Sequence, residues 1–231
     1  MGWSILGGED VEIRSGNATL QAHIGRPAAP GRYPAIITLH GINGPSAGTH
    51  RAAERYADHG IVGCALNWQS VDKDPADSEL MQYVADAAAF LRQQEYCDGD
   101  RIAVAGYCRG GGLVYLALEH HPWLRAGIAM HGFPFYPQGL SEKKPHHAYD
   151  LADRIQAPVL ILHGAADDRA PVSDVYRMAQ RLDELGKTFV LTVYSGTGHA
   201  FTLPDGGAYN PGAAANAWEQ SIAFLDRYLR D

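Results

Sequence analysis

The chain has 231 residues, of which 46% are hydrophobic and 19% charged, and its formal net charge at pH 7 is −7. This composition can bury enough apolar surface for a globular fold, unlike that of disordered chains. The negative charge, with no basic cluster beyond Lys143 and Lys144, removes the electrostatic basis of nucleic-acid binding. No run of about 18 apolar residues predicts a membrane span. We expect a single cytoplasmic domain over residues 1–231, a monomer or weak homodimer whose partner is a small molecule.

The cysteines and histidines give no sign of a metal site or a disulfide framework. The three cysteines, Cys64, Cys97 and Cys108, form no CxxC pair. His146 and His147 have no carboxylate or cysteine partner at ligand spacing. We therefore predict no metal and no cofactor.

Hydrophobic patterning predicts a chain that opens with strands and then alternates strands with helices. Strands are expected at Val11–Arg14, Ala18–Ile24, Ala35–Leu39, Ile61–Leu66, Arg101–Ala105, Ala126–Met130, Pro158–His163 and Thr188–Tyr194. Helices are expected at Gly48–His59, Asp77–Gln94, directly after Cys108, at Val172–Leu185 and at Ala213–Tyr228.

This alternation is typical of an α/β protein with a mostly parallel, doubly wound sheet and helices on both faces. The first two strands, separated by Ser15, Gly16 and Asn17, read as an antiparallel hairpin. The irregular insert at 132–149 is long and aromatic for a plain connector. Long loops inside compact domains are often functional, so we expect this insert to be a candidate lid or gate.

A nucleophilic side chain lies in the frame Gly106-Tyr107-Cys108-Arg109-Gly110, directly after a buried strand and before a helix. This is the context of a nucleophile elbow, whose central residue has a strained backbone and needs small neighbours two positions away on each side. Cys108 also begins a helix, where the dipole and the free N–H groups favour a thiolate. A buried structural cysteine would be the alternative, but the elbow context predicts a nucleophile.

In folds built around a nucleophile elbow, the acid and the base follow the nucleophile in a fixed chain order, each from a loop after a later strand. A G-x-x-D loop after the strand that ends at His163 supplies Asp167, with Asp168 as the alternative acid. Either aspartate could instead cap the helix that follows. The last strand is followed by a glycine loop that carries His199, which we predict to be the base.

The motifs G-Y-C-x-G-G, G-x-x-D ending in proline, and G-H-x-F resemble, in that order, those of the dienelactone hydrolases of the α/β-hydrolase superfamily. The likeness runs from about Ala18 to the terminal helix. It implies a triad of Cys108, Asp167 and His199. It also implies an oxyanion hole made by the backbone N–H of Arg109 and another from the turn at 38–42, where Leu39 is the nearest match.

Two positions depart from the family pattern. The family carries a glutamate that helps to activate the nucleophile three residues before a glycine, whereas Thr38 stands at that distance from Gly41. Activation of the thiol is then expected to rest on His199. Members that hydrolyse dienelactone carry an arginine four residues after the histidine, and this chain has Leu203 there. Dienelactone itself is therefore disfavoured as the substrate.

Further residues are expected to line the substrate pocket, because they lie where strands end at the predicted catalytic rim. Their apolar members would suit an uncharged or aromatic acyl group. These candidate substrate-binding residues are Thr38, His40, Ile42, Trp68, His131, Phe133 and Tyr136.

The sequence thus predicts an enzyme that hydrolyses a small ester or lactone through a cysteine nucleophile. Two alternatives stay open. One is a non-catalytic ligand-binding or sensor protein on the same fold, in which Thr38 and Leu203 record lost chemistry. The other is an acyl transferase, which passes the acyl group to an acceptor other than water.

Overall fold

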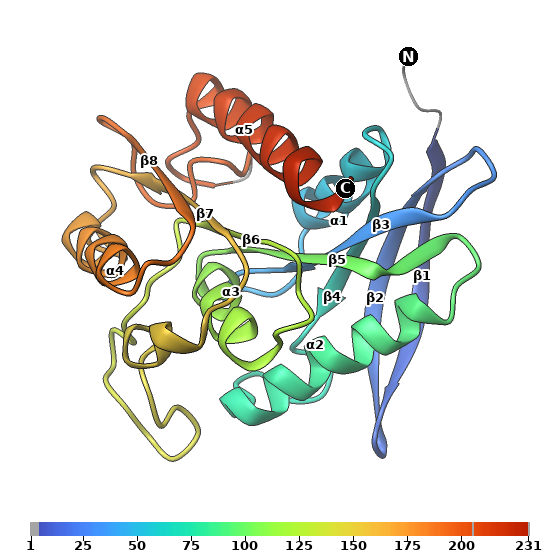
Figure 1. Ribbon diagram of the computed structural model, residues 1–231, viewed down its shortest axis with the longest axis horizontal. Coiled ribbons are helices and arrows are strands. Elements are labelled where there is room, and N and C mark those ends of the chain that lie inside the picture. The colour runs from blue at the N-terminus through green and yellow to red at the C-terminus, as the bar shows by residue number, and fades with distance from the viewer. Residues whose placement is uncertain (1–4, 205, 231) are drawn as a thin grey trace.

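An eight-stranded sheet runs through the computed structural model, which describes residues 5–204 and 206–230. Its strands are β1 (Ile5–Ser15), β2 (Ala18–Pro27), β3 (Tyr33–Leu39), β4 (Val62–Asn67), β5 (Cys97–Tyr107), β6 (Gly127–Met130), β7 (Val159–Gly164) and β8 (Phe189–Tyr194). They lie side by side in the order β1-β2-β4-β3-β5-β6-β7-β8 (Figure 1). β1 and β2 form the predicted antiparallel hairpin, β2 is antiparallel to β4, and every later pair is parallel. The predicted fold class is confirmed.

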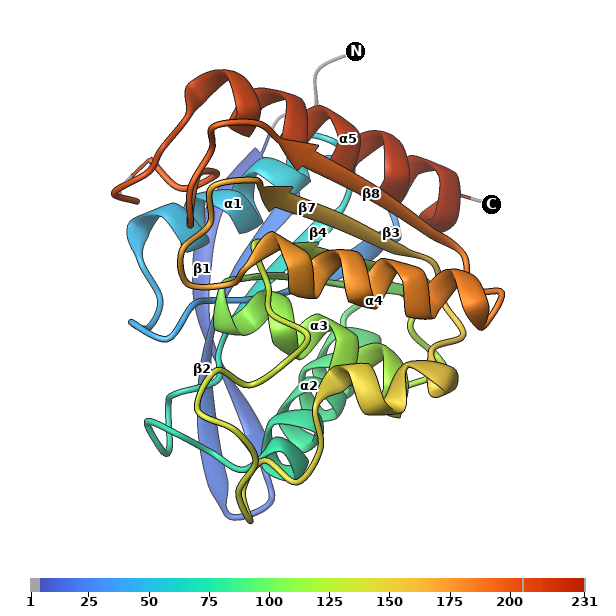
Figure 2. The same cartoon turned by 90° about the vertical axis from the view of Figure 1, so that its left-hand side faces the viewer.

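Helices cover both faces of the sheet. They are α1 (Ala47–Ala57), α2 (Asp77–Arg92), α3 (Arg109–His120), α4 (Val172–Glu184) and α5 (Pro211–Leu229), with a 3₁₀ helix, η1 (Ala148–Arg154). α1 and α5 pack on one face, whereas α2, α3 and α4 pack on the other. Figure 2 shows α5 and α4 on opposite sides of β7 and β8.

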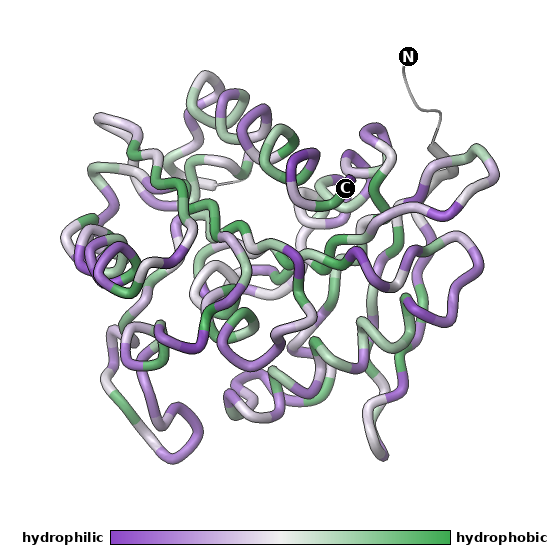
Figure 3. The backbone as a smooth tube through the Cα atoms, in the orientation of Figure 1, coloured by the Kyte–Doolittle hydropathy of each residue, from purple (hydrophilic) through white to green (hydrophobic). Residues whose placement is uncertain are grey.

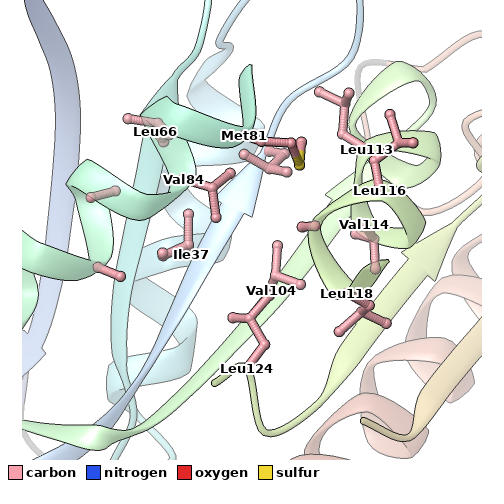
Figure 4. Packing of buried hydrophobic residues seen from close by; sticks show 14 of the residues in the cluster. Ile37, Leu66, Met81, Val84, Val104, Leu113, Val114, Leu116, Leu118 and Leu124 are labelled. Atoms are coloured by element: carbon pink, nitrogen blue, oxygen red, sulfur yellow. The ribbon is translucent and has the colours of Figure 1, made fainter. Parts of the chain in front are cut away.

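The core lies in two layers, one on each face of the sheet, because the central strands are apolar on both sides. All seven residues of β3 are buried, as expected for a parallel strand between two helical layers. Figure 3 shows that segments of hydrophobic residues run through the centre of the molecule and that segments of hydrophilic residues surround them. In the layer under α2 and α3, Met81 and Val84 of α2 belong to one cluster with Leu113 of α3 and Val104 of β5 (Figure 4).

The predicted elements differ from the observed ones mainly at their ends. β5 begins at Cys97 and reaches Tyr107, and so is longer than the expected Arg101–Ala105. The 3₁₀ helix η1, which begins at the last two residues of the insert, was not expected from the sequence. Its short length gives no helical periodicity to read. The insert at 132–149 is tied to a neighbouring loop, because the Asp77 N–H donates to the Lys143 carbonyl (2.8 Å) and Lys144 pairs with Asp74 (2.6 Å).

Parallel strands bring their carboxyl ends to one edge of the sheet. β3, β5, β6, β7 and β8 all point the same way, so the segments that follow them meet at this edge. Within the described ranges, no helix combines the length and the apolar character that crossing a membrane requires.

Replacing Gly63 in β4 with alanine is expected to destabilise the fold. A Cβ on Gly63 would lie 2.2 Å from the backbone oxygen of Ala53 in α1 and 2.6 Å from its Cα, and neither atom can turn aside. Because α1 would have to move off the sheet, we expect a loss of about 1–3 kcal/mol of unfolding free energy, measured by thermal denaturation. Gly207→Ala is the control, since a Cβ there meets nothing within 4 Å. Equal melting temperatures for the two variants would contradict this account of the packing.

Candidate active site

Cys108 lies in the sharp turn between β5 and α3, with φ 55° and ψ −116°. Non-glycine residues rarely adopt such a conformation, which stores strain and is typical of a nucleophile elbow. The flanking glycines permit it. A Cβ on Gly106 would lie 2.1 Å from the Gly110 oxygen, and one on Gly110 would lie 2.0 Å from the Leu39 oxygen. The G-x-C-x-G spacing therefore follows from two close backbone approaches.

Asp167 and His199 meet beside this turn. Asp167 follows β7, and His199 lies in the loop after β8. His199 Nδ1 donates to the carboxylate at 2.8 Å from Oδ2 and 3.0 Å from Oδ1. The backbone N–H groups of Arg169 (3.0 Å) and Ala170 (2.8 Å) also donate to Oδ1 and fix the carboxylate. Asp168, the alternative acid, is exposed.

The contacts of Asp167 also fix the tautomer of His199. Since Nδ1 carries the proton that Asp167 accepts, Nε2 is the nitrogen left to exchange a proton with Cys108. Nε2 makes no fully aligned hydrogen bond to a described residue. Such loose geometry is common when no substrate is bound.

The electrostatics of the site favour a thiolate and an imidazolium. Burial alone would raise the pKa of Cys108, but the hydrogen bond and charge of His199, with the N–H groups of Arg109 and Ile42, outweigh it and lower that pKa. Burial likewise opposes the charge of His199, yet Asp167 and Cys108 raise the His199 pKa to about 9. Both shifts point to an ion pair between sulfur and imidazole.

Two backbone N–H groups act on the thiol of Cys108, and one of them differs from the residue expected from the sequence. The N–H groups of Arg109 and Ile42 both lower the pKa of this thiol. Leu39 was expected to supply the second N–H, but it is the last residue of β3, and its carbonyl packs against Gly110. The donor lies within the expected turn at 38–42, but at its last residue and not at Leu39. We therefore assign the second candidate oxyanion donor to Ile42, whose side chain is 46% exposed.

His131 was expected to line the substrate pocket, but it lies fully buried behind Cys108. Its backbone is also strained, with φ 38°. The N–H of Cys108 donates to its Nδ1 (3.0 Å), while Nε2 lies 3.0 Å from Thr202 Oγ1. Burial, with the charges of His199 and His163, lowers the pKa of His131 to about 3. His131 is therefore neutral and holds the backbone of the candidate nucleophile, a role that sequence reasoning missed.

His40 and Trp68 were also expected to line the pocket, but they belong to a buried network. His40 bonds to the Gly41 carbonyl (2.7 Å) and to Asn67 (3.2 Å). Trp68 stacks on His40 and donates its indole N–H to the His40 carbonyl (2.9 Å). Both side chains are at most 2% exposed. They brace the turn before α1 and have no polar group free for a substrate.

A buried ion pair occupies the other side of the elbow. Arg109 bonds to Asp77 (3.0 Å), and its guanidinium lies over the ring of Tyr136, whose hydroxyl donates to the same carboxylate (2.7 Å). The hydroxyl of Tyr136 is thus engaged within the protein. Phe133 is half-buried, and its carbonyl and ring approach Gly112 of α3.

Thr38 lies inside β3, and its hydroxyl has no partner among the described residues. It is 2% exposed and is not among the groups that shift the pKa of Cys108. The position matched to the family glutamate therefore contributes nothing to the charge of the thiol.

One group in the described part of the chain has metal-ligating atoms close together, far along the sheet from Cys108. Asp10, His23 and His50 place one ligand atom each within 4.8 Å of the others. His23 already bonds to Asp10 (2.7 Å) and Glu54 (3.0 Å). Its ring stacks on His50 at an interplanar angle of 7°. Two parallel stacked rings cannot both contain one ion in their planes, so the geometry fits a charged hydrogen-bond cluster better than a metal site.

The elbow, the Asp167–His199 pair and the sheet topology together define a hydrolase of the α/β-hydrolase fold. The family model described as "Dienelactone hydrolase family" matches residues 65–229. The chain belongs to the dienelactone hydrolase family, as the sequence motifs predicted.

Relatives and solved structures agree with this assignment. A protein of Methylorubrum extorquens named "Putative carboxymethylenebutenolidase" is 30% identical, over 97% of this chain and 82% of its own. A Bradyrhizobium protein named "Probable 2-oxo-3-(5-oxofuran-2-ylidene)propanoate lactonase" is 26% identical, over 95% and 94%. The structure titled "Putative Dienelactone Hydrolase" from Klebsiella pneumoniae superposes with a TM-score of 0.91 at 25% identity, covering 97% of this chain and all of that one.

Proposed function

We propose that the protein hydrolyses a small ester or lactone, with Cys108 as nucleophile, His199 as acid and base, and Asp167 as the group that orients His199. The observation that carries the proposal is the pairing of a strained elbow cysteine with an imidazole whose Nδ1 is held by a buried carboxylate at 2.8 Å. Relatives named as a carboxymethylenebutenolidase and a lactonase support the substrate class.

The first half of the proposed reaction forms an acyl-enzyme. The Cys108 thiolate attacks the carbonyl carbon, and the oxygen that becomes negative is stabilised by the N–H groups of Arg109 and Ile42. The C–O bond to the leaving group then breaks. His199, protonated at Nε2, gives its proton to the departing alkoxide, which leaves a thioester on Cys108. In a lactone the alcohol stays attached, because the ring has opened.

In the second half, neutral His199 takes a proton from water through Nε2, and the hydroxide attacks the thioester carbon. The same N–H pair stabilises the oxyanion. The C–S bond breaks, the carboxylic acid leaves, and the thiolate–imidazolium pair is restored. Asp167 stays ionised throughout, since burial, which favours its neutral form, is outweighed by hydrogen bonds from His199 and Ala170 that lower its pKa.

The insert at 132–149 is proposed to be a wall of the substrate site within a single domain. Its ties to the loop at 72–77, including the salt bridge of Lys143 to Asp72 (3.0 Å), support a fixed position.

Alkylation across a pH range tests the proposal. Iodoacetamide reacts with the thiolate, so labelling of Cys108 should remain fast well below the ordinary cysteine pKa of about 8.5, because its pKa is lowered. Turnover of an alkyl ester such as methyl butyrate, whose alkoxide leaving group needs a proton, should be bell-shaped. It falls on the acid side as the thiolate is protonated, and on the alkaline side near pH 9 as His199 loses the proton that the alkoxide needs.

The His199→Asn variant is the control, because it removes the partner that depresses the thiol pKa. Its labelling curve should move to higher pH by about one unit or more. Labelling of the wild type that follows an ordinary thiol, together with no turnover of esters or lactones, would contradict the proposal and favour a ligand-binding protein. Faster turnover on adding alcohols or amines would instead indicate acyl transfer.

A further inference from the structure

A cavity of about 410 Å³ lies between α1, the start of α5 and the loop that follows His199. Its volume is in the range of pockets that hold small molecules. Tyr107 and Met130, the residues before Cys108 and His131, form part of its wall. None of the three candidate triad residues is among the described residues that line it, so this space is beside the reacting groups and not around them.

The described residues that line the cavity carry a charge opposite to that of the protein. The chain has a net charge of −7, yet the charged residues among the described lining are Arg51 and Arg55, with no described carboxylate. Both arginines are exposed and stand one turn apart on α1, where like charges repel. Arg55 is held over the ring of Trp218 (3.9 Å). The guanidinium of Arg51 forms no ion pair or hydrogen bond with any described residue, so it is free to bind an anion.

The rest of the lining selects for an unsaturated or aromatic body. Tyr209 provides a flat surface, and Trp218 provides the part of its ring that Arg55 and Tyr56 leave uncovered, while Leu203 and Met130 provide aliphatic surfaces. Guanidinium binds the planar carboxylate in a bidentate manner, and aromatic walls bind flat rings or conjugated chains. The lining therefore fits a small conjugated carboxylate better than an inorganic anion, which would leave the apolar walls exposed to water.

The cavity is linked to the candidate nucleophile through one buried ring. Thr202 lines the cavity, and its hydroxyl lies 3.0 Å from His131 Nε2. Nδ1 of the same ring accepts the N–H of Cys108 at 3.0 Å, so Nε2 carries the proton and donates it to Thr202. A molecule in the cavity would thus contact Thr202. Thr202 is hydrogen-bonded to His131, and His131 accepts a hydrogen bond from the backbone N–H of Cys108.

We propose that this cavity is a binding site for a small conjugated or aromatic carboxylate, with Arg51 binding the carboxylate and Trp218 and Tyr209 enclosing the body. The carboxylate that binds here is either a charged end of the substrate or a separate organic acid. The binding site itself does not depend on the proposed cysteine chemistry. Only the first source rests on the proposed function.

Binding is measured by calorimetry with trans-cinnamate, and with cinnamamide as the uncharged match. To keep the outcome independent of catalysis, the Cys108→Ala variant is titrated alongside the wild type. We expect both to bind cinnamate with equal affinity and cinnamamide at least about ten-fold more weakly, because the charge-assisted hydrogen bonds are lost. Arg51→Gln should weaken cinnamate binding by about ten-fold or more. Arg125→Gln, an exposed arginine that precedes β6 at the other end of the sheet, should bind cinnamate as the wild type does.

A second variant keeps the charge of Arg51 and fills the cavity. Ala214→Phe, at the start of α5, should fill the cavity and abolish cinnamate binding. The proposal is overturned if cinnamate fails to bind, or if neither Arg51→Gln nor Ala214→Phe weakens its binding.

Kinetics then distinguish the two sources. If the carboxylate belongs to the substrate, Arg51→Gln raises the ratio of KM for p-nitrophenyl hydrogen glutarate to KM for p-nitrophenyl butyrate by about ten-fold. If it belongs to a separate acid, cinnamate changes the kcat of the wild type on p-nitrophenyl acetate without raising KM, through Thr202 and His131. Both results support the site. If Cys108 of the wild type does not react with iodoacetamide, the cysteine mechanism is contradicted, whereas cinnamate binding measured by calorimetry still supports the cavity as a binding site.

Discussion

Replacing Cys108 with alanine is expected to lower kcat/KM for p-nitrophenyl acetate by at least about three orders of magnitude, because the proposed acyl-enzyme forms on its sulfur. The loss should appear in kcat, since the N–H groups of Arg109 and Ile42 still bind the carbonyl oxygen. The fold should persist, because alanine keeps the Cβ and the strained turn depends on Gly106 and Gly110. Steady-state kinetics with thermal denaturation measure both effects.

Cys64→Ala is the matched control. Cys64 is fully buried in β4, and burial raises its pKa to about 12, so it is an unreactive thiol. This variant should retain turnover and lose about 1 kcal/mol or more of stability. Full activity in Cys108→Ala would contradict the assignment of the nucleophile, and a large kinetic loss in Cys64→Ala would show that turnover responds to packing and not to the elbow sulfur.

The fold could be predicted from the sequence because its signals are local. Continuous apolar runs marked the parallel strands, and a stretch such as residues 35–39 is too short and too uniformly apolar to be a surface helix. The candidate triad could be predicted from the sequence for the same reason. Gly106 and Gly110 flank Cys108 within one turn, and the fold places every later loop at a known edge of the sheet. The structure brings His199 to Asp167 and not to the neighbouring Asp168.

What the sequence could not predict depends on where side chains and backbone N–H groups point. Leu39 and Ile42 lie in the same short segment, and only the path of the turn decides which N–H reaches the sulfur. His131 ends a strand at the active edge, which suggested a pocket residue. Its positive φ turns the ring back under Cys108 instead. The Gly132 that follows was the available signal, because it lets the chain pass close to Gly111 of α3.

The proposed mechanism activates the cysteine without the family glutamate. Thr38 is buried and has no part in the pKa of the thiol, so the charge on sulfur depends on His199 and two N–H groups. An uncharged residue at this position avoids placing a second anion near the thiolate, which would raise the thiol pKa. The ion pair therefore depends strongly on how His199 is held, and Asp167 is the residue that holds it.

Substitution of Asp167 with asparagine should consequently reduce kcat by about three to four orders of magnitude, although the side chain keeps its size. The amide oxygen would still accept the N–H groups of Arg169 and Ala170, which leaves the NH₂ group facing Nδ1 of His199. Two donors cannot face each other, so the ring places its proton on Nε2 and can no longer accept one from water. The pKa of His199 should also fall from about 9 toward its ordinary value, shifting the alkaline limb of turnover to lower pH. Asp168→Asn, one residue away and exposed, is the control and should retain activity. Comparable pH–rate profiles for the two variants would show that Asp167 does not orient the imidazole.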